Sequence, residues 1–247
     1  MHTLLENMSF PEVEDYLKEK DTVLVPVGSV EQHSEYGVIG TDFIAAEGVA
    51  REVGQKMGLM VAPTIHYGVS PHHMDFAGSV TLSPITFLHL IVDICCSFIR
   101  HGFSRIFFIN GHGGNKNALA SAFQQVKMDG GRGQLELFSW YDGLKETEIV
   151  RELFQDQDGS HATPSEISLT MLLRPAVFAE RAFEDKQNET PDYYWPLTAE
   201  EMRGTFPDGR MGASSWLASV EKGRLVMTVA VETLIEKIEK RQSIPVL

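Results

Sequence analysis

The 247-residue sequence has only two cysteines, Cys95 and Cys96, which are adjacent within an apolar segment of helical pattern. Two neighbouring cysteines do not form the disulfide framework of a small secreted protein, and thiols in an apolar helix are most simply core residues. The sequence therefore predicts a protein without disulfides in a reducing compartment, and we expect a cytoplasmic location.

Basic charge and long apolar segments are also scarce. Lys and Arg number 21 against 34 Asp and Glu, so the net charge is −13. Nucleic acids and anionic membranes are bound through basic surfaces, so we expect neither as a partner. No uninterrupted apolar run reaches the roughly 18 residues of a membrane span. Residues 1–6 lack the basic and apolar regions of a signal peptide.

Three common motifs are missing as well. The sequence has no Gly-x-Ser-x-Gly nucleophile elbow, no P-loop, and no dinucleotide fingerprint after its first predicted strand. Their absence disfavours the chemistry of each motif and makes the histidines and carboxylates the residues to examine.

The sequence does contain a regular alternation of strand-like and helix-like segments. Strands are predicted at 22–28, 59–63, 79–82, 105–109 and 134–140, and helices at 8–20, 43–57, 84–101, 117–127, 164–173 and about 219–240, with an acidic helical stretch within 142–158. Pro26 indicates a strand end or a bulge, because proline cannot donate to a ladder. The alternation predicts an α/β protein whose parallel sheet is covered on both faces. The length suits one large domain or two small ones, and we expect one domain over residues 1–247.

Residues 110–115, Asn-Gly-His-Gly-Gly-Asn, follow directly after the apolar strand 105–109. Open α/β sheets bind ligands beyond the carboxyl ends of their strands, which is where His112 is expected. The flanking glycines allow a sharp turn and a close approach of the backbone to a ligand. Taken alone, this histidine is equally compatible with an ordinary loop residue.

Three potential metal ligands, Glu31, His33 and Asp42, lie within twelve residues after the first strand. Glu31 and His33 are two positions apart, so in extended backbone their side chains point the same way. Asp42 opens the predicted helix 43–57, where an N-cap is the alternative to a ligand.

His161 and Glu166 form a second pair late in the chain. Glu166 falls in the first turn of the predicted helix 164–173, where the helix dipole favours an acid even without a metal. In the loop 64–78, which carries three histidines, His73 is the one most compatible with a site, and the other two are more simply solvated.

The candidates that share this chemistry are Glu31, His33, Asp42, His112, His161 and Glu166. Several lie just beyond predicted strand ends, at one edge of the sheet. Nitrogen and carboxylate ligands without thiolates suit Zn²⁺, Mn²⁺ or Fe²⁺. A two-metal site can hold a bridging hydroxide and polarise a carbonyl, so metal-assisted hydrolysis is the leading class of function.

Five pieces of the sequence, in this order, are similar to a known family. They are Pro-Val-Gly-Ser-Val-Glu-Gln-His at 26–33, Gly-Thr-Asp at 40–42, His73 with Gly-Ser-Val-Thr-Leu at 78–82, the segment 110–115, and His161-Ala162 with Glu166. Residues 212–223 add a similar approach to the last helix. The chain thus resembles the creatininase (creatinine amidohydrolase) family over nearly its full length, as a divergent member.

The resemblance implies a three-layer α/β/α sandwich with a mainly parallel sheet, two divalent ions per chain, and a homo-oligomer, commonly a hexamer. By motif position, Glu31, Asp42 and His112 would hold one ion. His33, Asp42 and a further carboxylate would hold the other, with Asp42 bridging. His161 would act on the proton, helping a bridging hydroxide to attack and the leaving group to depart. To the substrate pocket we assign Glu35, Tyr36, His73, Gly113, Gly114 and Trp140.

Three departures from the family pattern set this chain apart from creatininase itself. Gly114 stands where creatininase has a metal-binding glutamate, so we expect Glu166 to take that place at the second ion. Residues 34–38 replace the usual Gly-Pro-His-Leu-Pro, which alters the pocket wall. Ser160 stands where an acid precedes the catalytic histidine. Creatinine is therefore not the expected substrate.

Three hypotheses for function stay open. The first is hydrolysis of a C–N bond in a small cyclic amide or formamide, and the second is ring opening of a carbocyclic or sugar-like ketone at the same two-metal site. The third is a non-catalytic metal-binding assembly protein, against which the intact Glu31 and His161 argue. The long aromatic segment 181–206 is predicted to be a lid, a substrate wall or a subunit contact.

Overall fold

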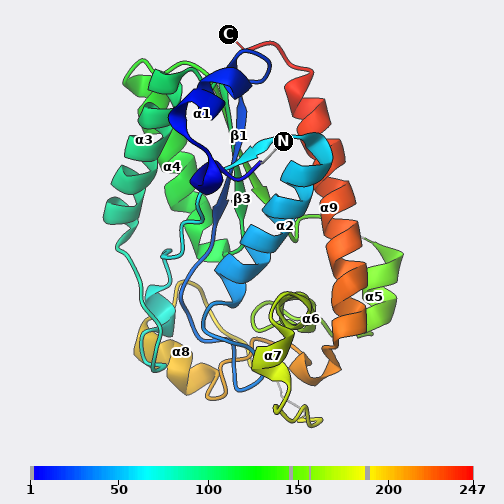
Figure 1. Cartoon of the computed structure of the whole chain (residues 1–247). Coiled ribbons are helices and arrows are strands. Elements are labelled where there is room, and N and C mark those ends of the chain that lie inside the picture. The colour runs from blue at the N-terminus through cyan, green and yellow to red at the C-terminus, as the bar shows by residue number, and fades with distance from the viewer. Residues whose placement is uncertain (1–2, 145–146, 156, 187–189, 247) are drawn as a thin grey trace.

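Helices cover both faces of a central sheet in the computed structural model, which describes residues 3–144, 147–155, 157–186 and 190–246 (Figure 1). The strands in the described part of the chain are β1 (Thr22–Val27), β2 (Met60–Val61), β3 (Arg105–Asn110) and β4 (Gln134–Ser139). They lie in the order β2-β1-β3-β4, and every neighbouring pair is parallel. The predicted parallel sheet is confirmed.

The helices follow the strands in the alternation that the sequence predicts. They are α1 (Phe10–Leu17), α2 (Thr41–Met57), α3 (Pro84–His101), α4 (Lys116–Met128), α5 (Glu148–Phe154), α6 (Pro164–Leu173), α7 (Pro175–Phe178), α8 (Ala199–Thr205) and α9 (Val220–Gln242). Short 3₁₀ turns occur at Leu5–Asn7, Pro71–His73, Gly113–Asn115 and Ser215–Leu217.

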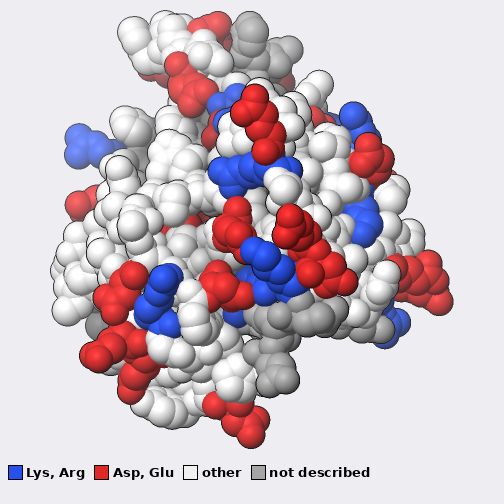
Figure 2. Space-filling view, turned by 90° about the horizontal axis from the view of Figure 1, so that it is seen from below, with Lys and Arg blue, Asp and Glu red and all other residues white. Residues whose placement is uncertain are grey.

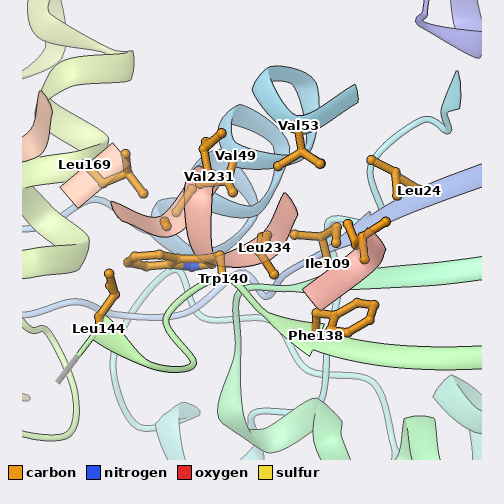
Figure 3. Close-up of a cluster of buried hydrophobic side chains, with 14 of the residues drawn as sticks. Leu24, Val49, Val53, Ile109, Phe138, Trp140, Leu144, Leu169, Val231 and Leu234 are labelled. Carbon is orange, nitrogen blue, oxygen red and sulfur yellow. The ribbon is translucent and has the colours of Figure 1, made fainter. Parts of the chain in front are cut away.

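Alternate residues of the strands supply two separate hydrophobic cores. On one face, Val23, Val25 and Val27 of β1 pack with apolar residues of α3 and α4. On the other face, Leu24 joins apolar residues of α2, α5, α6 and α9. Figure 3 shows this second cluster, in which Trp140 lies among side chains from several elements. Two cores, one on each side of one sheet, make the expected three-layer α/β/α sandwich.

Two predicted strands and one predicted helix differ from the structure. Residues 79–82 do not form a strand, because only Val80 pairs, in an isolated bridge with Val30. The strand predicted at 59–63 is reduced to the two residues of β2. The helical stretch within 142–158 contains only α5, and residues 145, 146 and 156 lie outside the described residues.

Pro26 lies one residue before the end of β1, in agreement with a strand end, and causes no bulge. It pairs with Ile109 of β3 in unbroken register, and its carbonyl accepts a hydrogen bond from the N–H of Ile65. A strand residue directs its nitrogen and its carbonyl to the same side, so the nitrogen of Pro26 faces the side where β2 has already ended at Val61. Proline is tolerated there because β2 has no carbonyl that needs an N–H donor from position 26.

Helix α3 is more exposed than a core helix. Its length and composition, with a mean hydropathy of 1.3, would suffice to cross a membrane, and 17% of that window is buried. The averaged hydropathy reaches this level although Asp93 and Arg100 interrupt the apolar run. Ile85 and Leu90 are exposed at 70% and 37%. Cys95 is a buried thiol as expected, whereas Cys96 is exposed.

Candidate metal centre

Glu31 places a carboxylate without hydrogen-bond partners at the centre of the site. It lies in the loop that follows β1, where its N–H donates to the carbonyl of Ile39. Its side chain is 0% exposed, and in the described part of the chain neither carboxylate oxygen has a hydrogen-bond partner. A buried charge in this condition is costly unless a cation or other ligand compensates it.

Asp42 enters the same space from the first turn of α2. The close approach of this turn to the end of β3 requires glycine at position 111, since a Cβ there would lie 2.2 Å from the carbonyl oxygen of Asp42. Asp42 is not the N-cap, because that position belongs to Gly40. Its carboxylate is therefore not committed to capping, and its Oδ2 has no hydrogen-bond partner among the described residues.

His112 follows β3 and faces both carboxylates. Its Nδ1 lies 3.1 Å from Oε1 of Glu31 and 3.3 Å from Oδ2 of Asp42. Its Nε2 lies 3.0 Å from the carbonyl oxygen of Val69, to which it can only donate. This contact leaves the lone pair on Nδ1, in the orientation that a metal-binding histidine requires.

His33 is oriented in the same manner from the other side of Asp42. Its Nδ1 lies 3.2 Å from the carbonyl oxygen of Glu31 and so carries the proton. Its Nε2 faces Oδ1 of Asp42 at 3.1 Å and has no hydrogen-bond partner. When each imidazole is neutral, as a metal ligand must be, its lone pair thus points towards Asp42.

Glu166 completes a group with His33 and Asp42, in which one atom of each residue lies within 4.8 Å of the others. It is also the third residue of α6, and its Oε2 accepts a hydrogen bond of 2.9 Å from the N–H of Thr163 in a capping box. The cap uses one carboxylate oxygen, so the other is available for a ligand. Position 114 cannot supply this carboxylate, since a Cβ on Gly114 would lie 2.3 Å from the carbonyl oxygen of Val69.

His161 reaches the centre from the loop between α5 and α6. Its Nδ1 lies 3.7 Å from Oε1 of Glu31, and its Nε2 lies 2.8 Å from the carbonyl oxygen of Gln32. The next residue, Ala162, has a φ of 55°, a left-handed conformation that is strained for a residue with a Cβ. Its carbonyl accepts a hydrogen bond from the hydroxyl of Ser215, which helps to hold this backbone in place.

Mutual attraction keeps the buried groups ionised. Burial raises the pKa of Glu31 and Asp42, but the neighbouring histidines outweigh it and bring each pKa to about 2. Burial lowers the pKa of His112 and His33, but the carboxylates raise the first well above its usual value and the second to about 9. Burial raises the pKa of Glu166 to about 7. The two protonated histidines thus supply the positive charge that balances Glu31 and Asp42, and bound metal ions would supply that charge in their place.

His161 differs from these two histidines. Burial and the charge of His33 lower its pKa to about 3. At neutral pH this imidazole is therefore neutral.

The donor set fits divalent metal ions. Two groups, Glu31 with Asp42 and His112, and His33 with Asp42 and Glu166, share Asp42. The unpartnered oxygens of Glu31 and Asp42 and the oriented histidine lone pairs are what Zn²⁺ or Mn²⁺ would satisfy. A third group consists of Glu31, His73 and His161.

A cavity of about 570 Å³ opens onto these groups. It is lined by His73, Gly113 and Gly114 of the predicted pocket, and by Tyr141, Lys116, His72, Tyr193 and Trp195, among others. The end of the molecule that carries α6, α7 and α8, seen from below in Figure 2, shows acidic and basic side chains interspersed.

Three residues assigned to the pocket from sequence lie elsewhere. Trp140 is 1% exposed and packs in the core, and its neighbour Tyr141 lines the cavity instead (Figure 3). Tyr36 is buried, and its hydroxyl donates to the carbonyl of Glu184. Glu35 lines a second cavity and pairs with Lys186 at 2.6 Å. Beyond the end of β4, the alternation of strand residues did not reveal whether Trp140 or Tyr141 faces the cavity.

The segment 181–206 contributes Tyr193 and Trp195 to the cavity wall, and its residues 187–189 lie outside the described part of the chain. The Trp195 ring contacts the edge of His72, with centroids 4.8 Å apart. The sequence signal for this wall was the run of aromatic residues in a long loop. His72, 7% exposed and next to His73, had no signal beyond its residue type.

Comparisons with known proteins find a family model and relatives that match nearly the whole chain. The family model described as "Creatininase: Creatinine amidohydrolase" matches residues 6–238. A creatinine amidohydrolase of Pseudomonas putida is 25% identical over 94% of this chain and 95% of its own length. A 3-dehydro-scyllo-inosose hydrolase of Thermotoga maritima is 24% identical over 95% of this chain and 81% of its own. A mycofactocin precursor peptide peptidase of Mycolicibacterium smegmatis is 40% identical over 44% of this chain and 46% of its own.

Solved structures show the same fold. The structure named "Creatininase Mn" superimposes with a TM-score of 0.82 at 22% identity, covering 98% of this chain and 99% of that one. A mutant creatininase described as "Zn-Zn type" gives 0.81 at 22% identity, covering 98% of both chains.

Proposed function

The chain belongs to the creatininase family of metal-dependent hydrolases, and from this premise we propose that it cleaves the C–N bond of a small cyclic amide or formamide with two divalent metal ions. The observation that carries the proposal is the cluster of unpartnered buried oxygens of Glu31 and Asp42, faced by oriented histidines. Two bound ions would lower the pKa of water and polarise the carbonyl of the substrate.

The residues divide into two sets of ligands. Glu31, Asp42 and His112 would hold one ion, and His33, Asp42 and Glu166 the other, so that Asp42 is shared. The contacts of His112 with Val69 and of His33 with the backbone of Glu31 fix which nitrogen faces each ion. Zinc, manganese and iron all suit these ligands, and cellular availability decides among them.

His161 is the proposed catalytic base and acid. Its Nε2–H donates to the carbonyl of Gln32, which leaves Nδ1 as an acceptor beside Glu31. The imidazole lines the cavity and is 8% exposed. It is placed to take the proton of the attacking water and to return it to the leaving nitrogen.

The nature of the relatives supports an amide as substrate. One is named an amidohydrolase and another a peptide peptidase, and both names denote cleavage of an amide C–N bond. The replacement of the metal-binding glutamate by Gly114 and of the preceding acid by Ser160 separates this chain from creatininase, so creatinine is not the expected substrate. Ring opening of a sugar-like ketone is the second candidate, favoured by the hydrolase of 3-dehydro-scyllo-inosose, which aligns with 95% of this chain.

Substitution of His161 by alanine tests the proposal. The zinc-loaded wild-type protein is assayed against cyclic amides, formamides, short peptides and cyclic ketones. We expect the variant to lose at least about 100-fold in rate, the low end of general acid–base catalysis, while its zinc content stays near that of the wild type. His89→Ala, on the exposed side of α3, is the matched control. Equal turnover by wild type and His161→Ala would exclude this role, and zinc binding without any turnover would favour the assembly protein.

Three further properties are part of the proposal. Residues 1–247 act as one domain, which is supported by the two cores that share one sheet. The chain forms a homo-oligomer, which agrees with the exposed Ile85 and Leu90 on α3. It works in the cytoplasm, which agrees with two free cysteines.

A further inference from the structure

Three groups of residues in the site have the spacing of metal ligands, although the proposed function uses only two of them. The third consists of Glu31, His73 and His161. Nε2 of His73 lies 3.5 Å from Oε1 of Glu31, and Nδ1 of His161 lies 3.7 Å from the same oxygen. Distances alone would allow a third ion here. Whether it can bind depends on which ring nitrogens carry protons.

The amide of Gln32 lies behind both imidazoles, and its orientation is fixed. Its Oε1 accepts a hydrogen bond of 2.7 Å from the N–H of Ser34. Its Nε2 lies 3.0 Å from the carbonyl oxygen of Gly209, to which it donates. Exchanging oxygen and nitrogen would put oxygen against oxygen at Gly209 and nitrogen against N–H at Ser34, so the amide cannot be reversed.

This orientation determines the proton of His73. The second N–H of the Gln32 amide points to Nδ1 of His73 at 3.1 Å, so this ring nitrogen accepts. A neutral imidazole carries one proton, which must then sit on Nε2. The nitrogen that faces Glu31 is therefore a hydrogen-bond donor and has no lone pair for a metal.

His161 has the opposite arrangement. Its Nε2 lies 2.8 Å from the carbonyl oxygen of Gln32 and 2.9 Å from the amide nitrogen of the same residue. If the amide donated to His161, the carbonyl of Gln32 and Nδ1 of His73 would both lose their partners. Donation from His161 to the carbonyl satisfies all of these buried groups, which is the less costly choice. His161 thus keeps a lone pair on Nδ1.

Gly209 holds the amide in place from a distant part of the chain. It has a φ of 82°, and a Cβ there would lie 2.0 Å from Oε1 of Gln32. The loop after α8 can therefore reach the amide only with glycine at this position. The carbonyl of Gly209 and the N–H of Ser34 together select one orientation of Gln32.

We infer that Gln32 keeps the group of Glu31, His73 and His161 free of metal by fixing the proton of His73 on the nitrogen that faces Glu31. The chain then holds two ions rather than three, and Nδ1 of His161 stays available for proton transfer. This inference rests on the proposed function for the count of two ions and for the role of His161.

The variant Gln32→Glu tests the inference without a substrate. A carboxyl group at this position accepts a hydrogen bond from Nδ1–H of His73, whether it is ionised or donates its own O–H to the carbonyl of Gly209. His73 would then present the lone pair of Nε2 to Glu31. We expect elemental analysis after zinc equilibration to give about one more ion per chain than the wild type. Gln134→Glu, the same change on β4 away from the site, is the control.

Nitrogen-15 NMR of histidine-labelled, zinc-loaded protein reads the tautomers directly. We expect His73 to be protonated on Nε2 in the wild type and on Nδ1 in Gln32→Glu. If the glutamate variant fails to fold, Gln32→Met removes the donor at similar size, and both tautomers of His73 should then be populated. Persistence of the pure Nε2–H tautomer in a folded variant overturns the inference.

The zinc count of the wild type separates the two proposals. Three ions per chain, with one lost in His73→Ala, would overturn the inference and leave the hydrolase intact. No bound zinc in the wild type would overturn the proposed function, whereas the NMR spectra would still decide whether Gln32 sets the tautomer of His73.

Discussion

At the scale of single residues, the geometry allows Glu166 both to cap a helix and to bind the proposed second ion, because the two roles can use different oxygens of one carboxylate. Oε2 closes the capping box of α6 with Thr163, and the carboxylate belongs to the group with His33 and Asp42. The sequence left open whether this acid caps a helix or binds metal, and the geometry shows that the cap does not prevent the proposed role as a ligand.

Glu166→Gln separates these tasks. Glutamine also closes a capping box, so α6 should keep its start, while the second ion loses its anionic ligand. We expect the metal content to fall from about two ions per chain to about one, as measured by elemental analysis. Thr163→Ala is the reverse control: it should cost about 1 kcal/mol of stability through the cap and leave both ions bound. Two ions at full occupancy in Glu166→Gln would exclude the ligand role.

Gly114→Glu should not restore the pattern of creatininase. A Cβ at this position would lie 2.3 Å from the carbonyl oxygen of Val69 and 2.4 Å from Nε2 of His112. The side chain would displace the contact that orients His112. We therefore expect the double variant Glu166→Gln, Gly114→Glu to bind no more metal than Glu166→Gln alone. Recovery of the second ion in the double variant would contradict this expectation. It would show that the loop at position 114 can accept a side chain while His112 still binds metal.

The sequence could predict which residues gather at the site, because Glu31, Asp42 and His112 each follow a strand or begin a helix at one sheet edge. It could not predict Gln32 as a partner of the histidines. That arrangement depends on Gly209, which is 177 positions away and has no local pattern that points to Gln32. The roles of the ligand residues stay predictions until metal is measured.

At the scale of elements, the predicted bounds were correct where the signals for them are local. Helices α3 and α6 begin at a proline preceded by a capping Ser or Thr, and α3 ends before Gly102 in the left-handed conformation. Strands were less predictable, because pairing depends on distant partners. Residues 79–82 have the composition of a strand, yet only Val80 finds a partner.

Tyr16 of α1 ties this helix to two strands. Its hydroxyl donates to the carbonyl of Thr22 at 2.6 Å and accepts from the N–H of Met60 at 3.1 Å. Tyr16→Phe removes both of these buried hydrogen bonds, so the free energy of unfolding should fall by about 1–3 kcal/mol, as measured by urea denaturation. Tyr67→Phe, whose ring is 50% exposed, is the control and should change it little.

The same hydroxyl gives a pH dependence. Burial raises the pKa of Tyr16 from 10.0 to about 12. Between these values the unfolded chain releases the proton and the folded chain retains it, so stability should fall as pH rises through this window. In Tyr16→Phe, the part of the alkaline loss of stability that comes from Tyr16 should be absent. If the free energy of unfolding fell with pH as steeply as in the wild type, the assignment to Tyr16 would be wrong.

At the scale of the whole molecule, metal should stabilise the fold, because ligands from the loop after β1, from α2, from the loop after β3 and from α6 meet in one place. At free zinc of about 100 times Kd, one site adds about 2.7 kcal/mol, which corresponds to roughly 5–11 °C in Tm for a chain of this size. Chelation followed by scanning calorimetry should show this fall, and added zinc should reverse it. Equal Tm with and without metal would contradict the shared site.

A two-metal centre that shares Asp42 is tested by elemental analysis of the wild-type protein, purified without chelator, beside His112→Ala. We expect about two ions of zinc, manganese or iron per chain in the wild type and a clear loss in the variant. No stoichiometric metal in the wild type, even after incubation with zinc or manganese, would exclude the two-metal centre.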